Sequence, residues 1–267
     1  MSTAGRVAAV RALMIGDVVG GVGLRALLSR LPGLREEHGP DVVVVNAENA
    51  AAGTGTSPRQ ARDLLDAGVD VLTGGNHTLQ KREIYPMLES EPRMLRPANI
   101  AARAPGRGVA TVETAAGPVS VVNVMGSVFM TAAHSPFAVI DDLVAEARRG
   151  ADVVLVDVHA EATSEKIALG WHLDGRVSAV VGTHTHVQTA DARVLPKGTA
   201  YVTDLGMTGP HDSVIGVRTE LILQRFLTGS PGRFEPADDN VLVQGAVVDV
   251  GAAGRATAIA TFSVPEA

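Results

Sequence analysis

Two histidines, His184 and His186, stand two residues apart directly after an apolar run over residues 177–181. The run is typical of a buried strand, so both imidazoles are expected just past the end of a strand. In open α/β sheets, ligands bind at the carboxyl ends of the strands. Residues i and i+2 of an extended segment point the same way, so this pair can reach one metal site or two adjacent sites.

Four further strand-like runs end in side chains that can bind metal. These side chains are Asp17, Glu48, Asn49, Asn76, His77 and His159. Glu48 is the hardest to explain as turn chemistry, because glutamate forms turns less readily than aspartate or asparagine. Turn roles for Asp17 and for the Asn76-His77 pair stay open as alternatives, since these residue types also favour turns.

Taken together, these strand ends predict one metal centre rather than several unrelated turns. Carboxylate and amide oxygens with imidazole nitrogens, and no sulfur, suit Fe, Mn, Zn or Ni. Leaving His77 aside, seven candidate ligands remain, which is more than the four that a structural zinc takes. Two ions that share a bridging carboxylate would use all of them. Asp157 and Glu161 are candidates to orient a ligating imidazole from behind.

Composition narrows the classes of function. Hydrophobic residues make up 46% of the 267 residues and aromatic residues only 3%, so the core must be aliphatic. A net charge of −6 provides no basic footprint for nucleic acid. The absence of cysteine excludes disulfides, thiolate metal sites and cysteine nucleophiles. With neither a signal-like segment nor an apolar run of about 20 residues, the sequence predicts a cytoplasmic protein without a membrane span.

The elements that must position these side chains alternate between strand and helix in the first half of the chain. Strands are expected at 7–15, 41–46, 69–72, 109–113, 119–124, 152–157, 177–181, 199–203, 241–250 and 255–262. Helices are expected at 24–37, 58–68, 136–149, 164–171 and 218–227, with Ser57 and Ser164 as N-caps. The pattern predicts a single α/β domain over residues 1–267, with two mixed sheets and helices on their outer faces.

The order of the motifs resembles that of the calcineurin-like metallophosphoesterases. The motifs are Gly-Asp at 16–17, Asn-Ala-Glu-Asn at 46–49, Gly-Asn-His at 75–77, His159, and Gly-Thr-His-Thr-His at 182–186. Segments 156–171, 180–191 and 204–210 are similar, more narrowly, to the bacterial YmdB family. Val19 stands where many superfamily members have a histidine ligand, and Asn49 replaces that ligand in the YmdB pattern. Ser127 stands where the family usually has arginine, which bears on substrate contact or assembly.

The resemblance implies a four-layer αββα sandwich and a role for each candidate residue. One ion would be held by Asp17, Glu48, Asn49 and His186, and a second by Glu48, Asn76, His159 and His184. His77 would be the general acid in an attack by metal-activated hydroxide. The metals implied are two divalent or trivalent ions, often iron, with manganese possible.

The implied activity is that of a phosphodiesterase acting on 2′,3′-cyclic nucleotides, in a homo-oligomer. The alternatives are a phosphomonoesterase or nucleotidase with the same two-metal site, and a metal-containing regulatory binding protein. In either enzyme, the expected substrate is a small phosphoester. The low aromatic content and the negative charge disfavour nucleic acid as the main ligand.

Overall fold

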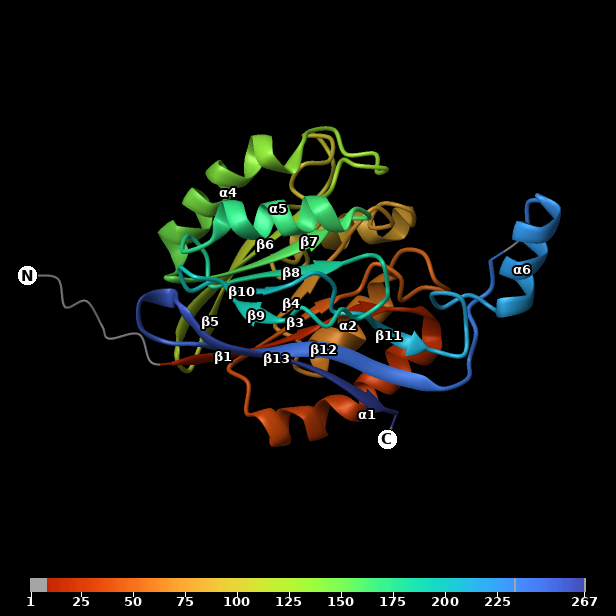
Figure 1. The fold of residues 1–267 in the computed structure, drawn as a ribbon, viewed down its shortest axis with the longest axis horizontal. Helices are drawn as coiled ribbons and strands as arrows, with labels where there is room; N and C mark the ends of the chain where they lie inside the picture. Colours follow the sequence, from red (N-terminus) through yellow and green to blue (C-terminus); the bar gives the residue numbers. More distant parts are fainter. Residues whose placement is uncertain (1–8, 233, 267) are drawn as a thin grey trace, which may run out of the picture.

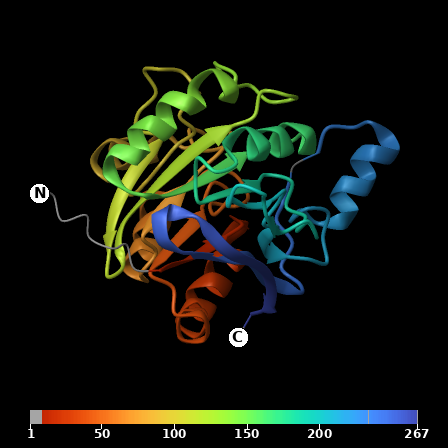
Figure 2. The same cartoon turned by 60° about the vertical axis from the view of Figure 1, so that its left-hand side comes forward.

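In the computed structural model, which describes residues 9–232 and 234–266, two mixed β-sheets pack face to face with helices on their outer sides. Figure 1 shows the resulting layers, with one helical layer below the first sheet and another above the second. The turned view in Figure 2 shows the same order of layers. The expected four-layer αββα sandwich is therefore confirmed.

The first sheet brings three parallel strands together at its centre and edge. Its members are β1 (Val10–Ile15), β2 (Asp17–Val18), β3 (Val42–Asn46), β4 (Val71–Thr73), β11 (Met207–Pro210), β12 (Val241–Val250) and β13 (Ala256–Pro265). They lie in the order β2-β11-β12-β1-β3-β4, with β13 paired to β12. Because β1, β3 and β4 run parallel, the side chains that follow their carboxyl ends lie at one edge of the sheet.

The second sheet has the same design. Its members are β5 (Val109–Thr114), β6 (Gly117–Met125), β7 (Val153–His159), β8 (Ala179–Thr183), β9 (Arg193–Val194) and β10 (Ala200–Val202). The order is β5-β6-β7-β8-β10-β9, and β6, β7, β8 and β10 are parallel. The antiparallel hairpin expected at β5 and β6 is present. His159 ends β7, and the loop carrying His184 and His186 follows β8.

Six α-helices complete the described part of the chain. They are α1 (Gly20–His38), α2 (Pro58–Asp66), α3 (Tyr85–Ser90), α4 (Pro136–Gly150), α5 (Thr163–Leu173) and α6 (Thr219–Thr228), with 3-10 turns at Arg82–Ile84 and Ala252–Gly254. Helix α1 covers the first sheet, α4 and α5 cover the second, and α6 projects away from the body (Figures 1 and 2). Among the described helices, none is both long and apolar enough to cross a membrane.

The core consists of small aliphatic side chains in three layers, as the composition requires. Val44 is buried between the two sheets, Leu27 on α1 packs against the outer face of the first sheet, and Val156 is buried under α4 and α5. Full burial of each such side chain stabilises the fold by about 1.5–3 kcal/mol. All five residues of β3 are buried, which explains its continuous run of valines.

Most element boundaries agree with those expected from the sequence, and the differences have physical reasons. The start expected for β1 at Val7 lies outside the described residues. Ser57 caps α2 in a capping box, but α5 begins at Thr163 and has no side-chain cap, so the cap expected at Ser164 is wrong. The sequence pattern gives no sign of β2, β9, β11 or α3, because two to six residues are too few to display a hydrophobic period.

Candidate metal centre

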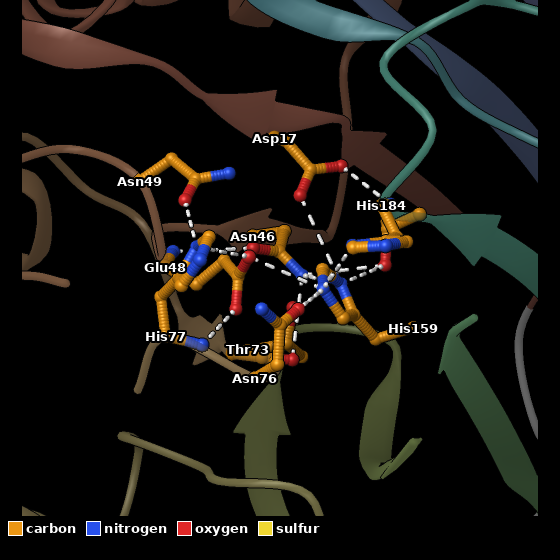
Figure 3. Close-up of polar contacts among 12 residues, drawn as sticks. Asp17, Asn46, Glu48, Asn49, Thr73, Asn76, His77, His159 and His184 are labelled. Atoms are coloured by element: carbon orange, nitrogen blue, oxygen red, sulfur yellow. Dashed lines mark hydrogen bonds and ion pairs between the residues drawn. The ribbon is translucent and has the colours of Figure 1, made fainter. Parts of the chain in front are cut away.

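Side chains from both sheets converge where β1, β3, β4, β7 and β8 end (Figure 3). All of the side chains singled out in the sequence lie in this cluster: Asp17, Glu48, Asn49, Asn76, His77, His159, His184 and His186. Asp17, Glu48 and His159 are buried, whereas Asn76 is exposed. One side of the cluster is therefore shielded from solvent, and the other side is open to it.

The tightest group contains Glu48, His159 and His184, each of which offers a ligand atom within 4.8 Å of the other two. Glu48 Oε1 lies 3.2 Å from His159 Nε2. Nε2 of His159 also lies 3.0 Å from Asn76 Oδ1 and 3.1 Å from His184 Nδ1. One carboxylate, one amide and two imidazoles at such separations form a suitable donor set for a transition-metal ion.

Asp17, Asn49 and His186 form the adjoining half of the cluster. Asp17 Oδ1 lies 3.8 Å from His186 Nε2, and the Asn49 amide nitrogen lies 3.0 Å from that same ring nitrogen. The Asn49 amide oxygen instead accepts a hydrogen bond from His77 Nδ1 at 2.7 Å. A ligand role for Asn49 therefore requires its amide to rotate, so that the oxygen faces His186.

Two buried carboxylate oxygens, Asp17 Oδ1 and Glu48 Oε1, have no hydrogen-bond donor among the residues that the structure describes. Glu48 Oε1 is 3.2 Å from both His77 Nδ1 and His159 Nε2, but neither contact has hydrogen-bond geometry. A buried carboxylate oxygen without a partner costs free energy unless a cation binds it. The residues present thus fit the metal ions that the resemblance implies.

Burial and mutual charge set the protonation of the cluster. Burial raises the pKa of Asp17 to about 6, against the opposing effect of the neighbouring imidazoles. Burial acts on Glu48 in the same direction, but His159 and His77 outweigh it and hold the pKa of Glu48 well below its usual range. Burial, together with the charge of His159, lowers the pKa of His184 to about 3. His184 is therefore neutral and has a lone pair to offer to a cation.

His159 is the charged imidazole of the cluster. Burial lowers its pKa, but the carboxylates of Glu48 and Asp17 outweigh burial and raise the pKa of His159 to about 9. Since a ligating imidazole must be deprotonated, a metal ion binds here by replacing this proton.

A buried hydrogen-bond chain orients His159 from behind. Nδ1 of His159 lies 2.9 Å from the Thr183 hydroxyl, which donates to Asp157 Oδ1 at 2.7 Å. Because Thr183 gives its only proton to Asp157, Nδ1 of His159 must donate, and Nε2 is left to face the cluster. The Asn46 amide donates to the other Asp157 oxygen at 3.2 Å. Sequence reasoning singled out Asp157 but missed Thr183, although Thr183 lies within the Gly-Thr-His-Thr-His motif.

Glu161, the other orienting residue expected from the sequence, lies beside His184. Its Oε2 is 3.0 Å from His184 Nε2, so it can accept a hydrogen bond from the N–H of that nitrogen. Nδ1 of His184 is then the nitrogen that faces His159 and the cluster.

His77 lies at the outer edge of the cluster, on a loop whose backbone passes close to Glu48 and His159. Its backbone N–H donates to Glu48 Oε2 at 2.9 Å, while its ring Nδ1 donates to Asn49. A Cβ atom at Gly75 would lie 2.2 Å from the His159 ring and 2.4 Å from Glu48 Oε2. Only glycine therefore lets the loop after β4 pass beside these two side chains.

A buried ion pair that sequence patterns did not identify holds the loop between the two histidines. Lys166 Nζ, on α5, lies 2.7 Å from Asp204 Oδ2. The same oxygen accepts hydrogen bonds from the Thr185 backbone and hydroxyl at 3.2 and 2.7 Å. His184 and His186 have φ angles of 96° and 64°, which are uncommon for residues other than glycine. Anchoring Thr185 keeps the loop in this unfavourable conformation.

Ser127 lies on the loop after β6 and bonds to α5. Its backbone N–H and its hydroxyl each donate to Glu165 Oε1 at 2.9 Å. Ser127 therefore joins this loop to helix α5, at the position where the family usually has arginine.

Comparisons with known proteins agree with this geometry. A sequence profile of the family described as YmdB-like protein matches residues 13–262. The chain is 45% identical over 241 residues to a 2′,3′-cyclic-nucleotide 2′-phosphodiesterase of Bacillus subtilis (strain 168), covering 90% of this chain and 91% of that relative. It superposes on a crystal structure of a hypothetical protein from Thermus thermophilus with a TM-score of 0.90 and 46% identity, covering 96% and 100% of the two chains. A novel phosphatase from Mycoplasma pneumoniae gives a TM-score of 0.89 at 32% identity, covering 97% and 95%.

Proposed function

This chain belongs to the YmdB-like protein family, and we propose that its strand-end cluster is a two-metal centre that hydrolyses 2′,3′-cyclic nucleotides. The chain is a phosphodiesterase, as the Bacillus subtilis relative is named. The observation that carries the proposal is a pair of buried oxygens, on Asp17 and Glu48, that have no hydrogen-bond donor among the described residues and lie within 3.8 Å of ring nitrogens of three histidines.

Each proposed ion takes ligands from both sheets. One ion is assigned to Asp17, Glu48, Asn49 and His186, and the other to Glu48, Asn76, His159 and His184. When bound, the ions supply a water of lowered pKa as the nucleophile and positive charge beside the phosphoryl oxygens. Iron is the proposed metal and manganese the alternative, because oxygen and imidazole donors without sulfur accept both.

His77 is the proposed general acid. Once the Asn49 amide rotates, as its ligand role requires, its N–H₂ group faces His77 Nδ1 and donates to it. His77 Nε2 then carries the ring proton and is the nitrogen left for the substrate. A proton from His77 lets the sugar oxygen leave as an alcohol, because an unprotonated alkoxide is a much poorer leaving group. The Glu48 carboxylate accepts a hydrogen bond from the His77 backbone N–H and so sets the position of the His77 side chain.

The proposed domain, compartment and assembly apply to the whole chain. Residues 1–267 act as one metallophosphoesterase domain, because the candidate ligands come from both sheets. The protein is proposed to act in the cytoplasm as a homo-oligomer on a small phosphoester, without nucleic acid as its main ligand.

The test combines metal analysis with a panel of substrates. We expect two metal ions per chain by elemental analysis, both visible in anomalous-scattering maps at the assigned ligands. Adenosine 2′,3′-cyclic phosphate should be hydrolysed faster than adenosine 2′-, 3′- or 5′-monophosphate. Preference for the monophosphates would instead identify a nucleotidase. Negligible hydrolysis by fully loaded protein, with specific capture of a partner, would identify a regulatory binding protein.

A further inference from the structure

A pocket of about 350 Å³ lies beside the candidate metal centre and has two chemically different walls. The polar wall carries Glu48, Asn49, His77, His184 and His186. The apolar wall is formed by Val19, Ala52, Ile215, Val217, Phe234 and Pro236. A pocket of this volume suits a small organic ligand with one polar and one apolar end.

The apolar wall presents one phenyl ring, that of Phe234, on a segment that is held in place. Phe234 is 51% exposed, and the Arg225 guanidinium lies 5.0 Å from its ring centroid. This contact occupies one face of the ring by a cation–π interaction. Backbone hydrogen bonds of 2.9 and 3.0 Å join residues 216–218 to residues 235–237, next to Phe234. The ring is therefore positioned before any ligand arrives.

Ile215 connects the apolar wall to the metal centre. Its carbonyl accepts a hydrogen bond from His186 Nδ1 at 2.8 Å, which leaves His186 Nε2 facing Asp17. Its φ angle is 47°, a left-handed value that is a genuine outlier for a β-branched residue. Such local strain is found where a site requires a particular geometry. The hydrogen bond thus sets the spacing between the apolar wall and the metal ligands.

We infer that the apolar wall is the nucleobase subsite, in which the base stacks on Phe234 while the cyclic phosphate lies at the histidines. The inference rests on the proposed function and adds to it the means by which the nucleoside is recognised. Among the residues that the structure describes, Thr54 is the only hydroxyl side chain that lines this pocket, and no Lys or Arg side chain lines it. Recognition therefore depends on stacking, which accepts every base and is stronger for the larger purine rings.

A second pocket, of about 510 Å³, shares His184 with the first and is also lined by Asn76 and the highly exposed Phe129. His77 lines the first pocket and is absent from the lining of the second. Because the general acid must contact the departing ribose oxygen, the ribose and its base belong in the pocket that contains His77. If the base instead lay in the second pocket, it would stack on Phe129, so Phe129 is the competing candidate for the stacking residue.

The test compares three alanine variants on substrates with and without a base. The substrates are adenosine 2′,3′-cyclic phosphate, its cytidine counterpart, and 1-O-methylribose 2′,3′-cyclic phosphate, which has no base. We expect Phe234→Ala to raise KM for the adenosine substrate about tenfold, the effect of losing one base–aromatic stack. Its kcat, and its kcat/KM on the substrate without a base, should not change, and Phe234→Trp should restore the KM. Phe226→Ala, a control at an exposed ring on α6 outside the pocket lining, should behave as wild type.

Calorimetric titration of the metal-loaded proteins with adenosine 3′-phosphate makes the same comparison without turnover. Equal affinity and equal KM in Phe234→Ala and wild type would overturn the subsite, as would a tenfold loss in Phe129→Ala instead. Failure of the wild type to hydrolyse any cyclic phosphate would overturn the proposed function. In that case, loss of nucleotide binding in Phe234→Ala would still locate the base.

Discussion

The two walls of the pocket are built in opposite ways. Glu48, on the polar wall, is 1% exposed and lies among side chains that bond to one another across both sheets, whereas Ile215, on the apolar wall, is 52% exposed. The polar wall forms part of the packed interior, where a small displacement disturbs many contacts. Most of the apolar wall, namely Ile215, Val217, Phe234 and Pro236, lies in the segment 211–240, whose helix α6 projects from the body. The polar wall is thus suited to fixed chemistry, and the apolar wall to selection among substrates.

The largest effect should come from Glu48→Gln, because both proposed ions lose the carboxylate that they share, and a neutral amide has only one oxygen to offer. We expect neither ion to be retained and hydrolysis to fall by more than the roughly 10²–10³-fold that a single electrostatic group contributes. Metal content by elemental analysis is the decisive measurement. Glu113→Gln, at an exposed position on β5, is the matched control. If Glu48→Gln kept both ions, the bridging role would be wrong.

His77→Ala should separate proton donation from metal binding within the polar wall. Turnover of a cyclic nucleotide should fall by about 10²–10⁴-fold, the usual contribution of a general acid. Metal content should stay near wild type, because His77 is not among the proposed ligands. His134→Ala, at an exposed histidine on a loop, is the control. Loss of metal from His77→Ala would make His77 a ligand rather than the acid.

The ligand candidates could be recognised from the sequence because each follows an apolar run that ends abruptly. Parallel strands place such positions at one edge of a sheet, so Asp17, Glu48 and His159 were expected to meet. The layered fold could be predicted for a related reason, since strands buried on both faces show as continuous valine runs. The resemblance to a known family then supplied the roles.

Other parts of the site leave no pattern in the sequence around them from which they could be predicted. The ion pair of Lys166 and Asp204 joins a helix to a distant loop, and its two residues are 38 positions apart. Nothing in either segment marks these charges as buried rather than solvated, which is the usual state of lysine and aspartate. Phe234 is equally hard to identify, because its meaning depends on a pocket that forms only when residues 215–217 and 234–236 pair beside the metal centre.

A smaller effect is expected behind the polar wall, from Asp157→Asn. The new amide has an N–H₂ group where Thr183 donates, so Thr183 can turn its proton to His159 Nδ1 and move the imidazole proton to the ligating nitrogen. Changes to such orienting partners lower metal affinity by about 10–100-fold. Competition with a metal chelator measures this loss, and Asp152→Asn on the exposed start of the same segment is the control. Unchanged metal affinity would show that another contact fixes the His159 tautomer.

The smallest effect should come from Ile215→Asn, where the two walls meet. Asparagine accepts the left-handed conformation that isoleucine resists, so the variant should gain about 1 kcal/mol in the free energy of unfolding. The hydrogen bond to His186 uses the backbone carbonyl and remains, so metal content should not change. The apolar wall loses aliphatic surface, so KM for a cyclic nucleotide should rise a few-fold while kcat holds. Denaturant unfolding and steady-state kinetics measure the two quantities. A loss of stability together with an unchanged KM would mean that Ile215 supports the fold and does not shape the pocket.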